Sequence, residues 1–276
     1  MSDTINLRAL APAKLNLFLH VTGRRQDGYH ELQTVFQLLN WGDDLEFERT
    51  EDGTITLSCD QPGLDTPDNL ILKAAQCLQA PGLGVRIRLT KRIPMGGGLG
   101  GGSSDAATTL LALNQLWQLG LSVDQLADKA LALGADVPVF VRGRSAWGEG
   151  IGEHLQPVSL PPRWYVIICP DCHVSTAEIF ADPELTRNTH PITMSAFFAG
   201  GGRNDLQPVV VSRYPAVAEA LESLAVYAPS MMTGSGSCVF AAFDDEREAL
   251  QAAEGIPLRS IVARGINVRP DIQNPR

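Results

Sequence analysis

Residues 94–107 of this 276-residue chain have the sequence PMGGGLGGGSSDAA, and this segment limits the possible folds more than any other. Six glycines fall within the seven positions 96–102, and two serines and a helix-forming pattern follow them. Glycines allow positive φ and let a ligand approach backbone N–H groups without a Cβ in the way. A helix after such a loop adds unpaired N–H groups and about half a positive charge. The pattern therefore predicts a phosphate-binding cradle rather than a flexible linker.

The better-known phosphate loops do not fit this segment. A Walker A loop needs a Gly-Lys pair, and the chain contains none. The G-x-G-x-x-G spacing at Gly96, Gly98 and Gly101 is one that any glycine-rich run satisfies. A Rossmann site also needs a strand after the helix, whereas Ser122 and Gln125 predict a capping box that starts another helix. The protein-kinase signatures H-R-D and D-F-G are absent from the sequence.

Composition and charge exclude several classes of protein. The chain is 44% hydrophobic and 19% charged, which is typical of a folded protein. Its net charge of −9 argues against a nucleic-acid partner but permits a small anion in a locally positive pocket. The longest apolar run, 164–169, is far shorter than the ~20 residues of a membrane-spanning helix, and the amino terminus does not resemble a signal peptide. Five scattered cysteines favour a reducing compartment. We expect a cytoplasmic protein with no membrane and no nucleic acid as partner.

The hydrophobic periodicity predicts an α+β fold. Alternation predicts strands at 13–19, 85–89, 164–169, 239–243 and 260–268, and a hairpin formed by 43–49 and 53–59. Helical patterns follow an N-cap at Asp68, follow the glycine run, start at Ser122, and cover 213–228 and 246–254. Strands and helices mix without regular βαβ alternation, which favours α+β over α/β. Glycine and proline concentrate at 148–162, so we expect two domains, 1–155 and 156–276.

Three segments together resemble the signatures of the GHMP kinase superfamily of small-molecule kinases. PMGGGLGGGSSDAA (94–107) resembles its glycine-rich loop, and APAKLNLFLHVTGRRQDGYHEL (11–32) and TGSGSCVFA (233–241) resemble its two other segments. DGYH (27–30), PDNL (67–70), LGADVPVFVRG (133–143) and IFADPELTRNT (179–189) are similar to the members that act on a cytidine-diphosphate-linked methylerythritol. The resemblance implies a two-domain GHMP kinase fold with the active site in the interdomain cleft. It further implies transfer of the ATP γ-phosphoryl group to the 2-hydroxyl of that substrate, giving ADP and the 2-phosphate, in the non-mevalonate isoprenoid precursor pathway.

Two candidate catalytic residues follow from this resemblance. Asp136 is implied to be the general base that accepts the proton of the attacking hydroxyl. From the sequence it lies at a helix end, where the negative end of the helix dipole disfavours a carboxylate, and a turn-forming Asp is the alternative. Lys14 lies between apolar residues of a strand, where a lysine is costly unless it pairs, and we expect it to contact Asp136. An edge-strand lysine that deters aggregation is the alternative. Whether Asp136 acts mainly as base or as positioning group stays open.

The substrate-binding residues are implied by the resemblance as well. Tyr29 and His30 resemble a cytidine-recognition pair, with Phe180 as a second ring, because flat aromatic faces suit a pyrimidine. Tyr29 packed in the core and His30 capping a turn are the alternatives. Asn16 is expected near the reacting hydroxyl. The small glycine turn Gly234, Ser235 and Gly236 is expected to contact substrate or phosphate through its backbone.

The nucleotide-binding residues form the largest group. The expected phosphate contacts are Pro94, Met95, Gly96, Gly97, Gly98, Leu99, Gly100, Gly101, Gly102, Ser103 and Ser104. The two serines could equally cap the helix or assist Mg²⁺, which ATP chemistry implies. The expected adenine-side residues are Asn69, Leu70 and Lys91, for which a helix start and a surface charge are the alternatives. No acidic cluster has metal-ligand spacing, so no protein ligand to the metal is predicted.

Two other functions remain open from the sequence. Another GHMP kinase would act on homoserine, mevalonate or a sugar, and would not need aromatic rings for a base. A non-catalytic nucleotide sensor on the same fold could dispense with Lys14 and Asp136, yet this chain has both residues.

Overall fold

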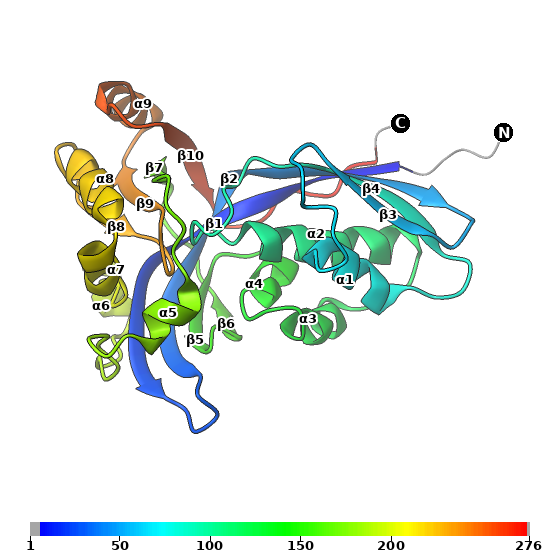
Figure 1. The fold of residues 1–276 in the computed structure, drawn as a ribbon, viewed down its shortest axis with the longest axis horizontal. Helices are drawn as coiled ribbons and strands as arrows, with labels where there is room; N and C mark the ends of the chain where they lie inside the picture. Colours follow the sequence, from blue (N-terminus) through cyan, green and yellow to red (C-terminus); the bar gives the residue numbers. More distant parts are fainter. Residues whose placement is uncertain (1–5, 275–276) are drawn as a thin grey trace.

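Two long antiparallel strands form the frame of the protein in a computed structural model that describes residues 6–274. Strand β1 (Asn6–Arg24) pairs with β2 (His30–Thr50) from Asn6 opposite Glu48 to Arg24 opposite His30. A typical strand has about five or six residues. With 19 and 21 residues, β1 and β2 are much longer, and they run through both parts of the molecule (Figure 1). The predicted strand at 13–19 is the middle of β1.

Within residues 6–274, ten strands join one sheet in the order β3-β4-β2-β10-β7-β9-β8, with β1 and β5 also on β2 and β6 on β5. The remaining strands are β3 (Ile55–Cys59), β4 (Gly84–Thr90), β5 (Ala146–Gly150), β6 (His154–Pro157), β7 (Trp164–Ile168), β8 (Ser230–Met232), β9 (Val239–Phe243) and β10 (Ser260–Ile266). The mixture of antiparallel strands and helices confirms the α+β prediction.

The predicted hairpin of 43–49 and 53–59 was wrong. Strand β3 pairs in parallel with β4, and β4 lies between β3 and β2. The apolar face of β4, with Val85, Ile87 and Leu89, is buried in the core. Opposite charges on the other face agree with this order, because Arg86 of β4 lies 2.9 Å from Glu48 of β2. Such cross-strand pairs stabilise the pairing of strands that are remote in the sequence.

Four helices cover the amino-terminal part of the sheet and five cover the carboxyl-terminal part, within the described chain (Figure 1). The first group is α1 (Leu70–Leu78), α2 (Gly101–Leu116), α3 (Val123–Leu131) and α4 (Val137–Arg142). The second group is α5 (Thr176–Ala181), α6 (Met194–Phe198), α7 (Gln207–Arg213), α8 (Pro215–Ala225) and α9 (Glu246–Gly255). None of them is both long and apolar enough to cross a membrane.

Two predicted helix boundaries were wrong and one was confirmed. Asn69, not Asp68, caps α1, since its side chain accepts a hydrogen bond from the Ile71 N–H. The helix predicted over 213–228 is present as α8, but it begins at Pro215 because the residue before a proline is sterically driven out of helical φ/ψ. The predicted capping box of Ser122 and Gln125 is present at the start of α3.

Separate apolar cores lie at the two ends of the molecule. One packs α1 to α4 against β1, β2 and β4, with Phe47 and Leu110 at its centre. Another packs α7, α8 and α9 against β7 and β9, and takes Leu19 and Val21 from β1. Strand β1 contributes to both cores, and one sheet runs through both parts of the chain. The division into domains 1–155 and 156–276 stays a proposal.

The close contact of β1 and β2 at Gly42 predicts a large effect of one methyl group. Gly42 lies opposite Pro12, and a Cβ there would come within 1.9 Å of the Ala11 carbonyl oxygen. Because the clash is with backbone, we expect Gly42→Ala to lower the free energy of unfolding by about 3 kcal/mol or more. Denaturant unfolding measures the change. Gly23→Ala in the same ladder is the control, since its Cβ would lie 3.6 Å from Glu31; equal stability of the two variants would contradict the prediction.

Candidate active site

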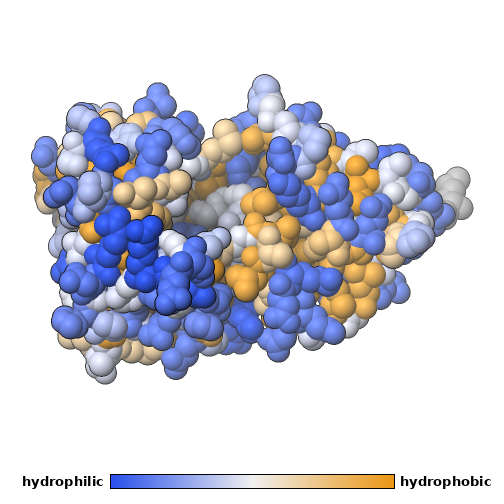
Figure 2. Space-filling model, turned by 60° about the horizontal axis from the view of Figure 1, so that its bottom comes forward, coloured by the Kyte–Doolittle hydropathy of each residue, from blue (hydrophilic) through white to orange (hydrophobic). Residues whose placement is uncertain are grey.

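A cavity of about 1040 Å³ lies between the two ends of the molecule. Its lining comes from both parts of the chain, including Lys14 and the glycine loop from one and Phe180 and Gly234 from the other. Figure 2 shows the surface hollowed between these parts. A deep, mixed-polarity cavity of this kind is the usual place of a small-molecule site.

The glycine loop is clamped between β1 and the turn before β9. The Lys14 N–H donates to the Leu99 carbonyl at 3.0 Å, and the Cys238 N–H donates to the Gly97 carbonyl at 3.1 Å. At Gly98, where φ is +74°, a Cβ would lie 2.2 Å from the Thr233 carbonyl oxygen. The glycines therefore serve two purposes, because the protein packs against one side of the loop while the other side lines the cavity.

Helix α2 begins inside the glycine run rather than after the serines. Gly100 is its N-cap, with φ +73°, and no side chain caps the first turn. The first-turn N–H groups, from Gly101 to Ser103, therefore lie beside the cavity without intrahelical partners. An anion here would receive these hydrogen bonds and the positive end of a 16-residue helix dipole.

Lys14 and Asp136 meet in the cavity, which confirms the predicted contact. Lys14 Nζ lies 3.3 Å from Asp136 Oδ2 and 2.5 Å from Asn16 Oδ1. The lysine side chain is 3% exposed and the aspartate 35%, so only the carboxylate is open to a ligand. The ammonium also lies 5.6 Å from the centre of the Phe36 ring. A buried cation, a partly exposed carboxylate and an amide thus converge on one point.

The expected unfavourable helix dipole at Asp136 was wrong. Helix α3 ends at Leu131, and Asp136 is the N-cap of α4. Asp136 therefore lies at the positive end of the α4 dipole and not at the negative end of the α3 dipole.

Threonines on neighbouring elements hold Asn16 in place. Its amide Nδ2 donates to Thr34 Oγ1 at 2.9 Å, and its backbone N–H donates to Thr233 Oγ1 at 2.9 Å. The amide oxygen is thereby directed toward Lys14, and the position of the ammonium depends on β2 and on the turn before β9 as well as on β1.

An aromatic group lies at the tip of the β1–β2 hairpin. Tyr29 is 60% exposed and lines the cavity, so it is not packed in the core. The rings of His30 and Phe180 lie 5.0 Å apart at an interplanar angle of 31°. Burial, followed by the charges of Arg187 and Arg24, lowers the pKa of His30. These rings offer flat surfaces to a planar ligand.

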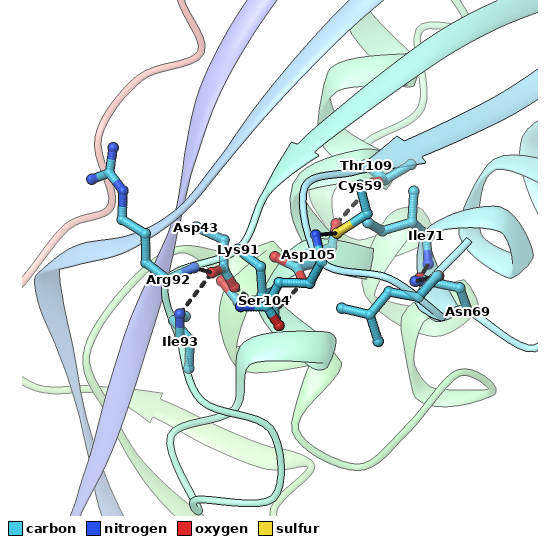
Figure 3. Close-up of polar contacts among 12 residues, drawn as sticks. Asp43, Cys59, Asn69, Ile71, Lys91, Arg92, Ile93, Ser104, Asp105 and Thr109 are labelled. Carbon is cyan, nitrogen blue, oxygen red and sulfur yellow. Dashed lines mark hydrogen bonds and ion pairs between the residues drawn. The ribbon is translucent and has the colours of Figure 1, made fainter. Parts of the chain in front are cut away.

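Lys91 belongs to a buried charge cluster beneath the loop (Figure 3). Its Nζ lies 2.5 Å from Asp43 Oδ2 and 2.8 Å from Asp105 Oδ2. Asp43 Oδ1 also accepts the backbone N–H groups of Arg92 and Ile93. Burial opposes the charge of Lys91, but the two carboxylates outweigh it and raise the lysine pKa. Lys91 lines the cavity, yet its ammonium is committed largely to these acids.

Asp105 is the second carboxyl group of this cluster, which contains two aspartates and one lysine. Burial raises the pKa of its carboxyl group to about 7. The charge of Lys91 lowers this pKa, and the nearby Asp43 raises it. The Asp105 Oδ1 has no hydrogen-bond partner among the described residues. The sequence analysis assigned no role to Asp105, although it follows Ser104 directly in the glycine-rich segment.

Most of the predicted site residues line this cavity, and two do not. Ser104 is fully buried, and its hydroxyl donates to the Pro12 carbonyl at 2.7 Å, because α2 begins early and turns this side chain toward β1. Gly236 packs against the Met232 side chain instead. Asn69 lines the cavity, but its amide is used in capping α1 and in donating to the Leu64 carbonyl.

The sequence analysis missed further lining residues. They are Thr34, Phe36, Asp105, Gly152 and Thr176, among others. Thr34 and Phe36 lie on the central strand β2, where nothing in an alternating strand pattern distinguishes a cavity-facing residue from a core residue. Within residues 6–274, no group of three or more His, Cys, Asp or Glu side chains is placed to hold a metal ion.

Comparison with known proteins agrees with this geometry. The profile of the GHMP kinases N terminal domain matches residues 69–144, and that of the GHMP kinases C terminal matches residues 191–259. A 4-diphosphocytidyl-2-C-methyl-D-erythritol kinase from Nitrosococcus oceani is 54% identical over 262 residues, covering 93% of this chain and 94% of that protein. The chain belongs to the GHMP kinase family. This GHMP kinase is therefore a small-molecule phosphotransferase.

Two further relatives of this GHMP kinase carry the same name. The kinase from Shewanella woodyi is 53% identical over 276 residues, covering 98% of this chain and 97% of that protein. A crystal structure of 4-(cytidine 5'-diphospho)-2C-methyl-D-erythritol kinase superimposes with a TM-score of 0.80 at 36% identity, covering 94% of this chain and 98% of that one. The predicted GHMP kinase fold is confirmed.

The raised pKa of Asp105 predicts a pH-dependent gain in stability for Asp105→Asn. The carboxyl pKa is about 7 in the folded protein and ordinarily 3.8, so between these values the folded protein binds a proton that the unfolded chain lacks. Stability from this group is therefore lost as pH rises from 4 through 7. An asparagine does not titrate, so we expect the free energy of unfolding of the variant, relative to that of the wild type, to rise by about 2 kcal/mol between pH 5 and pH 8.

Denaturant unfolding at several pH values measures this difference. Asp128→Asn, an exposed aspartate on α3, is the matched control and is expected to show no such trend. An advantage of Asp105→Asn that is constant with pH would contradict the assignment of a raised pKa.

Proposed function

We propose that this GHMP kinase transfers the γ-phosphoryl group of ATP to the 2-hydroxyl of 4-diphosphocytidyl-2-C-methyl-D-erythritol, giving ADP and the 2-phosphate. The observation that carries the proposal is that one cavity brings together a phosphate cradle, the Lys14–Asp136 pair and an aromatic group suited to a pyrimidine. The names of the relatives agree with this substrate.

The glycine loop is proposed to hold the triphosphate. The free N–H groups at the start of α2 would bond the phosphate oxygens and stabilise charge that develops during transfer. Magnesium accompanies ATP in such reactions and neutralises phosphate charge. Because the described residues contain no group of three ligating side chains, we assign the ion no protein ligand and derive no step from it.

Asp136 is proposed to accept the proton of the substrate hydroxyl. Its carboxylate faces the cavity, while Lys14 Nζ, 3.3 Å away, supplies a buried positive charge that stabilises the alkoxide as it forms. Asn16, held by Thr34 and Thr233, fixes the ammonium and can orient the hydroxyl. Little proton removal is needed in a loose phosphoryl transition state, so positioning and charge stabilisation carry much of the catalysis.

The cytosine ring is proposed to lie at the aromatic end of the cavity. Tyr29 and Phe180 offer their faces, and His30 offers the edge of its ring. Gly234 and Ser235 line the cavity and are proposed backbone contacts for the diphosphate or the methylerythritol. Asn69, Leu70 and Lys91 are the proposed adenine-side residues.

We place the reaction in the cytoplasm, as a step of the non-mevalonate isoprenoid precursor pathway. The five cysteines, all of which lie within the described residues, are free thiols, in keeping with a reducing compartment.

The role of Asp136 predicts a selective loss of turnover. Asp136→Asn removes the proton acceptor but keeps the shape of the side chain, so we expect kcat to fall by about 100- to 10,000-fold while the protein stays folded and ATP binding stays near wild type. Steady-state kinetics and ATP titration measure these effects. Asp124→Asn, on the exposed start of α3, is the control. Near-normal turnover of Asp136→Asn would remove this residue from the chemistry.

Release of ADP tests the substrate assignment. We expect turnover with Mg-ATP and 4-diphosphocytidyl-2-C-methyl-D-erythritol, and none with homoserine or mevalonate. Base stacking on an aromatic ring contributes about 1–3 kcal/mol, so Tyr29→Ala is expected to raise KM for the cytidylyl substrate about 10- to 100-fold without changing KM for ATP. Turnover of another alcohol would exclude the cytidine pocket. ATP binding without turnover would favour a nucleotide sensor.

A further inference from the structure

Arg187 makes an unusual set of contacts behind the aromatic end of the cavity. Its Nε donates to His30 Nε2 at 3.1 Å. Its remaining nitrogens donate to the carbonyls of Leu185, Phe180 and Asp182 at 3.0, 2.9 and 2.6 Å. Arg187 is half-buried and does not line the cavity, so it can affect a ligand only through the groups that it holds.

The contact with Arg187 determines where His30 carries its proton. A guanidinium is always protonated and has no acceptor, so His30 Nε2 must offer its lone pair. The neutral ring therefore has its hydrogen on Nδ1. Burial, Arg187 and Arg24 also lower the pKa of His30, which disfavours a second proton. Within residues 6–274 nothing hydrogen-bonds Nδ1, and this nitrogen is not among the buried atoms that lack a partner. His30 lines the cavity and thus has an N–H donor left for a ligand.

A fixed N–H donor distinguishes cytosine from uracil. Cytosine has two acceptors side by side, the ring nitrogen N3 and the carbonyl O2, whereas N3 of uracil carries a hydrogen. A donor aimed at this edge bonds cytosine and opposes the N3–H of uracil. A histidine free to exchange tautomers would present either a donor or an acceptor and would lose this discrimination.

We propose that Arg187 is a positioning residue that holds His30 as an Nδ1–H donor and thereby selects a cytosine over a uracil diphosphate substrate. This inference rests on the proposed function. The same guanidinium holds the Phe180 carbonyl, so the histidine edge and the Phe180 ring are placed by one side chain.

The test compares the cytidine substrate with its uridine analogue, 4-diphosphouridyl-2-C-methyl-D-erythritol. Arg187→Met keeps an apolar stem and removes the donor. We expect the ratio of kcat/KM for the cytidine over the uridine compound to fall at least 10-fold, mainly through KM for the cytidine compound, with kcat changed less than 3-fold. Arg213→Met is the matched control, because Arg213 is paired with Asp182 at the same end of α5 but makes no contact with His30. An unchanged ratio in Arg187→Met would overturn the proposal.

A double-mutant cycle separates positioning from a structural effect of Arg187. If Arg187 acts through His30, Arg187→Met will not lower the discrimination further in a His30→Ala background. A further loss of similar size in that background would mean that Arg187 only supports α5, and would overturn the proposal.

Nitrogen NMR of the free full-length protein tests the tautomer without substrate. We expect His30, assigned by the loss of its signals in His30→Ala, to have a protonated Nδ1 and an unprotonated Nε2, and to become a tautomer mixture in Arg187→Met. His20, whose Nε2 accepts the Arg203 N–H at 3.3 Å, is expected to show the same tautomer and to keep it in both variants. Protonated Nε2 of His30 in the wild type would refute the proposal. This readout is independent of turnover, so a protein that does not phosphorylate the cytidine compound would fail the proposed function while the tautomer is still measured.

Discussion

The buried ammonium of Lys14 is the constraint around which the proposed active site is built. A lysine that is 3% exposed must be compensated, and the compensation comes from residues remote in the sequence. Asn16 supplies an amide oxygen, Asp136 a carboxylate and Phe36 a ring face. The Lys14 stem also lies against Gly100, where a Cβ would come within 3.2 Å of it. Satisfying one charge thus requires β1, β2, the glycine loop and the start of α4 to meet.

A second buried lysine shows how the same chemistry serves a different purpose. Lys91 lies between two nearly inaccessible acids, whereas the carboxylate that pairs with Lys14 is partly open to the cavity. Removing one member of a buried ion pair typically costs about 3–5 kcal/mol, because the other charge is left uncompensated. The Lys91 cluster joins the end of β4 to the start of α2, the two elements between which the glycine loop runs. The Lys14 pair instead leaves an oxygen available for chemistry.

Two of the apolar side chains that line the cavity are exposed. Tyr29 and Met95 are 60% and 64% exposed, although both line the cavity. Exposed apolar side chains that gather in a concave site are typical of surfaces that a ligand covers. In contrast, the groups that orient these rings, such as Arg187, are half-buried and committed to hydrogen bonds. The cavity is therefore lined by exposed apolar side chains, and a hydrogen-bonded arginine lies behind the rings.

Local patterns in the chain were enough for the features that depend on neighbouring residues. The glycine loop, the α+β class and the capping box at Ser122 were predicted from such patterns, because backbone freedom, strand alternation and helix capping are properties of a short segment. The contact of Lys14 with Asp136 joins remote residues and was predicted with the help of a family resemblance. The strand order depends on long-range pairing and was not predicted correctly: β4 lies between β2 and β3, and its arginines pair with glutamates about 40 residues earlier. The hydrogen bond of Ser104 to Pro12, the pairing of Asp105 with Lys91 and the contact of Arg187 with His30 were not predicted, because their partners come from distant elements that only tertiary packing brings together.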